Sequence, residues 1–132
     1  MTDDDILKIP FFELLGAELL EATPGLVRAR LQWSPERCTT NGIMHGGALM
    51  ALADNCGGIC AFLNMPEGAI GTATIESKTN FLRGVTGGAV TSVTRPLHLG
   101  RTIAVLETEL AREDGKLAAK VAQTQVFHYP RR

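Results

Sequence analysis

The chain has 132 residues, of which 45% are hydrophobic and 20% are charged, and its mean hydropathy is +0.07. These values are typical of one globular domain with a real core, so residues 1–132 are predicted to form a single domain rather than a disordered or membrane-embedded chain. The formal net charge of -1 and the pI near 6.3 exclude a general electrostatic attraction to nucleic acid or to an anionic membrane surface.

The N-terminus and the cysteines both favour a soluble protein of the cytoplasm. Residues 1–5 are acidic where a secretory signal would be basic, and no run approaches the ~18 apolar residues of a membrane span. Cys38, Cys56 and Cys60 are odd in number, and the last two share one apolar helical stretch. This pattern favours buried thiols in a reducing compartment over a disulfide framework.

The N-terminal segment is predicted to form a short surface lid. Thr2 is a candidate N-cap for a helix, and Pro10 interrupts that helix before the apolar segment 11–16.

Most of the remaining chain reads as β-strands. Val, Thr and Ile dominate these segments, and Gly, Pro and Asp-Gly turns separate them. The predicted strands cover residues 17–22, 26–33, 69–82, 89–99, 102–112 and 117–128, with the first two joined as a hairpin.

One long helix is predicted from about Gly46 to about Leu63, after a polar loop. Apolar residues recur at three- and four-residue steps, and alanines fill much of the rest, so the helix is apolar nearly all round and therefore central. Gly57 and Gly58 in its interior cost roughly 1 kcal/mol each relative to alanine. We therefore expect another backbone to approach the helix closely at this point.

The element order β-β-α-β-β-β-β indicates an α+β fold in which an antiparallel sheet wraps around one long helix. One helix cannot cover so much sheet, and a helix that is apolar on nearly every side would leave a patch exposed. A second copy of the chain would cover that patch, so a homodimer is the minimum assembly expected.

Two glycines at the start of this helix are candidates for chemistry. The backbone N–H groups of Gly46 and Gly47 are unpaired within the helix and point outward with the positive end of its dipole. Such groups can bind a phosphate, or polarise a carbonyl and stabilise the oxyanion formed when it is attacked. The alternative is that both glycines only turn the chain into the helix.

Asp54 is the single carboxylate of the helix. It follows Gly46 by eight residues, or ~12 Å along the axis, so one substrate carbonyl cannot contact both groups of the same chain. If both serve one reaction, they come from different chains. Apolar neighbours would desolvate Asp54 and suit it to act as a general base or nucleophile, whereas the alternative is an ordinary carboxylate that reaches solvent.

His45 is a candidate general base, metal ligand or positioning residue. A metal site is disfavoured because Cys56 and Cys60 lack a zinc spacing and because Asp54 lies about half a turn from Cys56 on the helix. A serine triad is equally poorly supported, since the chain contains no Gly-x-Ser-x-Gly motif.

Residues 42–48, Asp54 and residues 74–83 together resemble the hotdog-fold acyl-CoA thioesterases of the phenylacetate-pathway (PaaI-like) type. Residues 10–16 and 100–105 extend the resemblance over nearly the whole chain. His-Gly-Gly followed by an acid nine residues after the histidine is fairly specific for this branch. The resemblance implies a hotdog fold, dimers often paired into tetramers, active sites between chains, and hydrolysis without a metal or organic cofactor.

The resemblance also implies a role for each catalytic candidate. Asp54 would activate water or attack the thioester directly, the Gly46 N–H would polarise the thioester carbonyl, and Thr74 would orient the water, with His45 as a positioning group. The family commonly has Asn or Gln six residues before the motif histidine, whereas this chain has Thr39. Asn41 is the alternative source of that contact.

The implied substrate is an aryl- or medium-chain acyl-CoA. The candidates for holding it combine the helix start with basic residues near strand ends, which ordinary surface charge explains equally well: Gly47, Asn41, Arg83, Arg101, His98 and Lys78. Four apolar residues are candidate walls of an acyl tunnel, with core packing as the alternative: Leu49, Met50, Phe62 and Phe81.

Two other functions remain open from the sequence. A hotdog dehydratase or hydratase would need a histidine and acid pair to move a proton at carbon, which the spacing of His45 and Asp54 matches less well. A non-catalytic acyl-CoA binding module would have no need for a carboxylate near the thioester.

Overall fold

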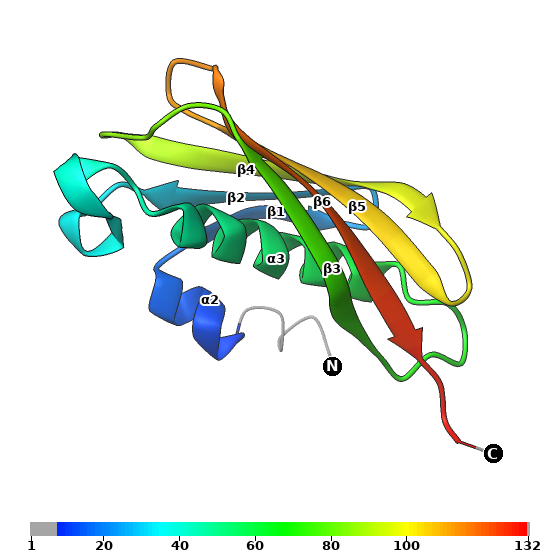
Figure 1. Ribbon diagram of the computed structural model, residues 1–132. Helices are drawn as coiled ribbons and strands as arrows, with labels where there is room; N and C mark the ends of the chain where they lie inside the picture. The colour runs from blue at the N-terminus through cyan, green and yellow to red at the C-terminus, as the bar shows by residue number, and fades with distance from the viewer. Residues whose placement is uncertain (1–7, 132) are drawn as a thin grey trace.

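A six-stranded antiparallel sheet curves around one long helix in the computed structural model, which describes residues 8–131 (Figure 1). The strand order is β1-β2-β4-β5-β6-β3. The N-cap predicted at Thr2 lies outside the described residues. The elements are α2 (Pro10–Leu15), β1 (Glu18–Thr23), β2 (Leu26–Gln32), two short 3-10 turns (Pro35–Arg37 and Thr40–Gly42), α3 (Gly46–Leu63), β3 (Gly71–Phe81), β4 (Ala89–Leu99), β5 (Ile103–Ala111) and β6 (Leu117–His128).

The observed boundaries agree with the predicted helix and with all six predicted strands to within two residues. The predicted α+β architecture of a sheet around one central helix is therefore confirmed. The hairpin expected at the start of the chain is present, since β1 pairs with β2 in antiparallel register despite the imperfect alternation of its side chains.

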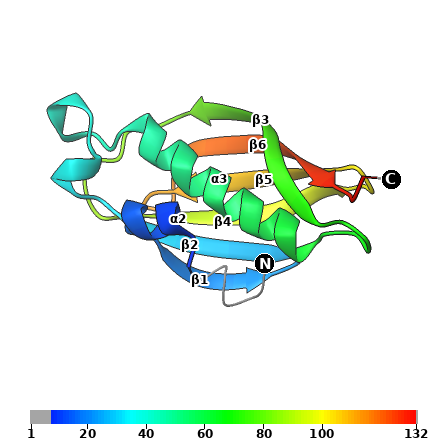
Figure 2. The ribbon, with the colours of Figure 1, turned by 90° about the horizontal axis from the view of Figure 1, so that it is seen from below.

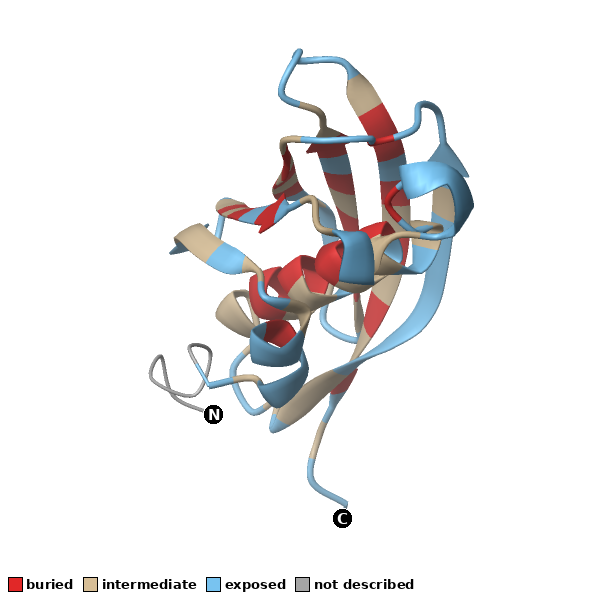
Figure 3. Ribbon diagram, turned by 90° about the vertical axis from the view of Figure 1, so that its left-hand side faces the viewer, coloured by how far each residue is buried: buried red, intermediate tan, exposed pale blue. Residues whose placement is uncertain are grey.

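Helix α3 lies across the concave face of the sheet, with α2 beside it (Figure 2). Buried residues gather where α3 and the strands face each other (Figure 3). The buried side of α3 consists of Leu49, Leu52, Ala53, Cys56, Gly57, Ile59, Cys60 and Ala61. The opposite stripe, which contains Met50 and Asp54, is exposed, so α3 is buried on one side only within a single chain.

The expectation that no run is long and apolar enough to cross a membrane is wrong for α3. Its 18 residues have a hydropathy of 1.3, which passes a test of length and composition, because alanine and glycine occupy many positions that would otherwise be polar. In this fold 44% of those residues are buried within the molecule, on the side of α3 that packs on the sheet.

The two cysteines of α3 are buried thiols, as predicted. Burial raises the pKa of Cys56 to about 11, opposed by its hydrogen bond with Ser92, and burial likewise raises the pKa of Cys60 to about 11. Both sulfurs are therefore protonated at neutral pH and are poor nucleophiles. Cys38 is only partly buried and donates to the Ser34 carbonyl (3.3 Å).

Strand β3 forms one edge of the sheet and is exposed along most of its length. Among residues 8–131 it pairs only with β6, and a β-bulge between Thr74 and Glu76 interrupts the register. Ile75 at the bulge is 61% exposed and Phe81 at the strand end is 53% exposed. An uncovered edge that carries large apolar side chains is a ready template for association.

Gly57 leaves space for a side chain. The prediction that another backbone approaches the helix at this glycine is wrong. A Cβ atom at Gly57 would overlap the amide of Gln123, which reaches from β6 to donate to the Ala53 carbonyl (3.2 Å). Gly58 has no neighbour within 4 Å of the corresponding position, so its lack of a side chain leaves open space instead.

The adjacent glycines provide a matched pair of variants. Gly57→Ala should lower the free energy of unfolding by about 1–3 kcal/mol, because the new methyl group displaces Gln123 in a packed interior. Gly58→Ala should raise it by up to ~1 kcal/mol, because alanine is the better helix former and meets no obstacle. Urea unfolding of both variants measures the difference, and equal effects of the two substitutions would contradict this assignment of Gly57.

Candidate active site

The N-terminus of α3 is capped by a histidine side chain. His45 has extended backbone angles, and its Nδ1 accepts a hydrogen bond from the Gly47 N–H (2.7 Å). Because Nδ1 is an acceptor here, the neutral ring carries its proton on Nε2. The Gly47 amide, predicted to contact substrate, is therefore already occupied by this cap.

The Gly46 N–H remains unpaired. It is the first N–H of the helix, and it donates to no acceptor among residues 8–131. A Cβ atom at this position would lie 3.0 Å from the ring of Phe81, so a glycine here allows that ring to pack against the backbone. The free amide at the positive end of the helix dipole is suited to stabilise developing negative charge.

Asp54 and Thr74 meet between α3 and β3. The Thr74 hydroxyl donates to Asp54 Oδ1 at 2.7 Å, which joins two of the predicted catalytic residues directly. Asp54 Oδ2 accepts no hydrogen bond from residues 8–131. The carboxylate is thus held in place through one oxygen while the other is left for chemistry.

The expectation that apolar neighbours surround Asp54 is wrong for the single chain, in which Asp54 is exposed. The apolar residues next to it in sequence point toward the sheet, whereas Asp54 lies on the outward stripe of α3. Neighbours in sequence on a helix do not share a face, so an apolar sequence context does not imply a desolvated carboxylate.

Two buried glutamines, Gln123 and Gln125, lie behind Thr74, and the sequence did not predict a function for them. Gln125 Nε2 donates to the Thr74 hydroxyl and to Gln123 Oε1 (3.1 Å), and Gln125 Oε1 accepts from Thr72 (3.0 Å). Both glutamines are 1% exposed. The signal that could have found them is the alternation of β6, which places residues 121, 123, 125 and 127 on its buried face, where amides need partners.

The β-bulge in β3 determines which side chains face α3. Thr74 is directly opposite Gln125, but beyond the bulge Glu76 is opposite Thr124 and Ser77 is opposite Gln123. Without the extra residue, Glu76 would share the face of Thr74 because side chains alternate along a strand. The bulge therefore keeps a second carboxylate away from Asp54.

A cavity of about 260 Å³ adjoins Asp54. Its walls combine the Asp54 and Thr74 side chains with apolar surface from α3 and from the segment before α2, and the Gln125 amide lines it as well. Gly58 is part of the wall, so the open space noted at this glycine belongs to the cavity.

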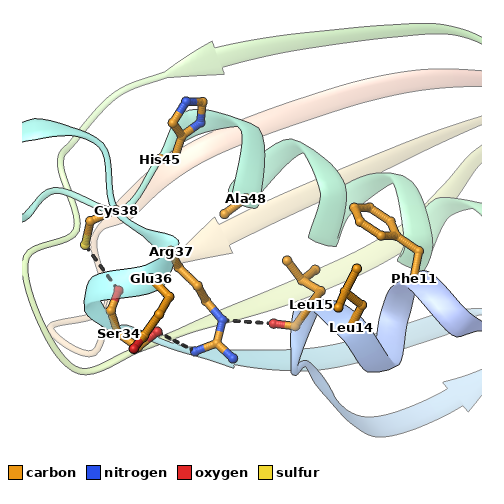
Figure 4. A pocket seen from close by; sticks show the side chains of 9 residues that line it. All are labelled: Phe11, Leu14, Leu15, Ser34, Glu36, Arg37, Cys38, His45 and Ala48. Atoms are coloured by element: carbon orange, nitrogen blue, oxygen red, sulfur yellow. Dashed lines mark hydrogen bonds between the residues drawn. The ribbon is translucent and has the colours of Figure 1, made fainter.

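A larger cavity of about 530 Å³ lies at the start of α3, between α2 and the loop 34–38 (Figure 4). Phe11, Leu14 and Leu15 of α2 form its apolar side, and His45 and Ala48 belong to the first turn of α3. Arg37 connects loop and helix, since its Nε donates to the Leu15 carbonyl (2.8 Å) and its guanidinium to Ser34 Oγ (3.0 Å).

The other predicted ligand residues do not gather at one place. Arg83 donates to the Leu117 carbonyl (3.0 Å), whereas Arg101 lies over the ring of Tyr129 at 5.4 Å. His98 lies near the end of β4 and Arg101 in the turn that follows it, at the end of the sheet opposite the start of α3 (Figure 1). Lys78 is exposed on β3. A single chain therefore has no basic cluster that includes all four candidates.

Thr39 and Asn41 are exposed in the loop before α3. The Thr39 N–H donates to the Ile43 carbonyl (2.8 Å), and Asn41 has a positive φ of 64°, a conformation that asparagine tolerates better than most residues. Both residues shape the turn that delivers the chain to His45.

The predicted acyl walls do not line the cavities at Asp54 and His45. Leu49 is a buried core residue, Phe62 packs against the core, and Met50 is 39% exposed on the outward stripe of α3. Leu49 and Phe81 line a separate hollow with loop 82–85. Within residues 8–131, no group of three or more His, Cys, Asp or Glu side chains is arranged to hold a metal ion.

Residues 41–119 match the family model of the thioesterase superfamily. The chain belongs to the thioesterase superfamily. The predicted resemblance, the hotdog fold and the enzyme class of thioester hydrolases are thereby confirmed. The matched residues include the capped start of α3, Asp54 and Thr74.

Several thioesterase-superfamily relatives resemble this chain in sequence or structure. A 1,4-dihydroxy-2-naphthoyl-CoA hydrolase from Escherichia coli is 34% identical over 107 residues, which cover 80% of this chain and 72% of that protein. A mutant of the phenylacetic acid degradation protein PaaI from Thermus thermophilus superposes with a TM-score of 0.80 at 28% identity, covering 90% of this chain and 98% of that one.

A third relative is thioesterase PA1618 from Pseudomonas aeruginosa. The structure of one of its mutants superposes with a TM-score of 0.87 at 27% identity, covering 97% of this chain and 94% of that one. The sequence alignment to PA1618 is 39% identical over 75 residues and spans about half of each protein, 57% of this chain and 52% of the relative.

Removing the His45 side chain tests its part in building the thioesterase site. His45→Ala should lower the free energy of unfolding by about 1 kcal/mol, the usual cost of losing an N-cap side chain. His45→Asn should retain most of that stability, because asparagine is a strong N-cap residue. Thermal or urea unfolding measures both variants, and an equal loss in both would show that capping is not what His45 contributes.

Proposed function

We propose that the protein is an acyl-CoA thioesterase that hydrolyses aryl- or medium-chain acyl-CoA at sites shared between two chains. One observation carries the proposal: a carboxylate oriented by Thr74 and an unpaired N–H at Gly46 lie near the same exposed side of one helix, ~12 Å apart. Neither half-site is complete by itself.

A two-fold symmetry axis near Met50 would bring the two half-sites of different chains together. Gly46 and Asp54 each lie four residues from Met50, or ~6 Å along the helix. If two α3 helices pack antiparallel across their exposed stripes, Asp54 of one chain comes opposite Gly46 of the partner subunit, and the symmetry generates two equivalent sites. Met50, a flexible side chain exposed in the single chain, would be covered by such packing.

The uncovered edge of β3 supports the same assembly. Exposed Ile75, Phe81 and Leu82 lie on or just beyond this edge, beside the stripe of α3. Burying them against a second copy satisfies backbone groups and removes apolar surface from water in one step. We therefore propose a homodimer, and pairing of dimers into a homotetramer as the resemblance to PaaI-like thioesterases implies. We also propose a cytoplasmic location.

The proposed chemistry needs only water and these groups. Asp54 takes a proton from water as the water oxygen attacks the thioester carbonyl carbon, and the Gly46 N–H of the partner subunit stabilises the oxyanion. When the carbon–sulfur bond breaks, the proton passes to the departing sulfur, which leaves a free acid and the CoA thiol. In the alternative route, Asp54 attacks the carbon itself and water then cleaves the resulting anhydride.

The cavity beside Asp54 supports a small acyl group. At about 260 Å³ it lies just below the usual range of ligand pockets, about 300–1,000 Å³, and its walls are largely apolar. The aryl-CoA substrate in the name of the Escherichia coli relative is in line with an aryl group of this size. Thr39 or Asn41 would contact the thioester or the water, and the basic residues Arg83, Arg101 and His98 are the candidates for the CoA moiety.

Replacing Asp54 tests the proposed chemistry. Asp54→Asn should lower thiol release from a panel of aryl-, short- and long-chain acyl-CoAs by at least 100-fold, because an amide neither accepts the proton nor attacks the carbonyl. Thiol release is followed with a chromogenic disulfide, at matched folding by circular dichroism. Full activity of the variant across the panel would refute the mechanism.

The same panel separates the rival functions. An altered double bond with the thioester intact would indicate a dehydratase or hydratase, and binding of acyl-CoA without any turnover would indicate a binding module. Free thiol with release of the acid supports hydrolysis.

Mixing two inactive variants tests whether the sites are shared. Gly46→Pro removes the proposed donor and is compatible with the fold, because proline is favoured at the first helical position and His45 already has the extended backbone that precedes a proline. Random exchange with Asp54→Asn would place one intact site in half of the dimers, so about a quarter of wild-type activity should return.

Gly46→Ala is the matched control, because it keeps the N–H and adds only the methyl group near Phe81. It should retain far more activity than Gly46→Pro. No recovery of activity after verified subunit exchange would rule out sites shared across the dimer.

A further inference from the structure

A chain of hydrogen bonds runs from the backbone of α3 through β6 and back to Asp54. It begins at the Ala53 carbonyl, which accepts from Gln123 Nε2 (3.2 Å), and continues through Gln125 and Thr74 to Asp54 Oδ1. Both of its ends therefore lie on consecutive residues of one helix, although the middle of the chain lies on two strands.

The carbonyl at its start determines the direction of every bond that follows. A backbone carbonyl can only accept, so Gln123 must present its NH₂ to Ala53 and its oxygen to Gln125. Gln125 must then direct its NH₂ toward Gln123 Oε1, and the oxygen of the Gln125 amide accepts from the Thr72 hydroxyl (3.0 Å). Neither glutamine amide can be flipped without placing two donors or two acceptors against each other.

The two hydrogens of the Gln125 NH₂ go to Gln123 Oε1 and to the Thr74 hydroxyl. Thr74 has one hydroxyl proton, and its oxygen is already an acceptor from Gln125 on this side, so the proton is directed to Asp54 Oδ1. Burial stabilises this arrangement of hydrogen bonds. Both glutamines are 1% exposed, so breaking one of these bonds would leave a buried amide group unpaired, which is unfavourable in free energy.

We propose that Gln125 is a positioning residue for hydrolysis: it orients the Thr74 hydroxyl toward Asp54 Oδ1, and so leaves Asp54 Oδ2 as the oxygen that acts on water or on the thioester. Gln123 holds Gln125 in place, and Gly57 leaves the space that Gln123 occupies. This inference rests on the proposed function of Asp54.

The consequence is a coupling between residues 125 and 74. Gln125→Met keeps the size of the side chain and removes its hydrogen bonds, so Thr74 is free to turn its proton away from Asp54. We expect kcat to fall roughly 10- to 100-fold, comparable to one hydrogen bond to a charged group. KM should change by less than about threefold, because Gln125 acts on the reacting group and not on substrate binding.

A double-mutant cycle separates positioning from a general structural effect. In a Thr74→Val background there is no hydroxyl to orient, so Gln125→Met should lower kcat by less than about threefold further. Thr74→Ser is the matched control: it keeps the hydroxyl, so the full loss on Gln125→Met should persist. Equal losses in the Thr74→Val and Thr74→Ser backgrounds would overturn the proposal.

Side-chain amide resonances provide a readout that needs no substrate. The Gln125 NH₂ signals, assigned by their absence in Gln125→Met, should shift strongly in Thr74→Val and little in Thr74→Ser. If Gln125→Met does not fold, Gln123→Met should show the same coupling to Thr74. Unchanged signals in Thr74→Val would refute the bond itself, whereas an active Asp54→Asn beside shifted signals would refute only the proposed function of Asp54.

Discussion

The packing of α3 against the curved sheet is the contact on which the rest of the structure depends. Eight of its residues are buried against the strands, and this burial brings β3, β4, β5, β6 and β2 into contact with one helix. Because a helix buries only the side that faces the sheet, the same packing leaves a stripe of α3 exposed. The two groups of the proposed site lie near that stripe, so the interaction that stabilises the core also determines where Asp54 and Gly46 are displayed.

Much of this arrangement could be predicted from local patterns. The helix and strands follow from periodicity and turn residues, and Gly46 and Asp54 stand out as a glycine at a helix start and a lone acid in an apolar helix. Their separation depends only on the helical rise, which is why the hypothesis of a site shared between chains can be formed from the sequence alone. Thr74 came from the family resemblance, and its hydrogen bond to Asp54 supplies the physical reason.

What escaped prediction depends on contacts between residues distant in sequence. Asp54 was expected among apolar neighbours, yet those neighbours face the sheet and Asp54 does not. Gly57 was expected to admit a backbone, yet it admits the side chain of Gln123, 66 residues later in the sequence. In each case periodicity identifies a special position, but only the register between β6, β3 and α3 determines which atom occupies the space.

That register also explains why so polar a network is tolerated in the interior. A buried glutamine is destabilising unless both the NH₂ and the oxygen of its amide are paired. Here both groups of Gln123 and Gln125 are paired, and the Ala53 carbonyl determines which way the two amides point. The bulge after Thr74 contributes by placing Ser77, rather than Glu76, opposite Gln123. A carboxylate at that place would compete for the Gln123 NH₂ and add a second charge near Asp54. The network, the bulge and Gly57 thus form one structural unit that leaves Asp54 as the one carboxylate bonded to Thr74.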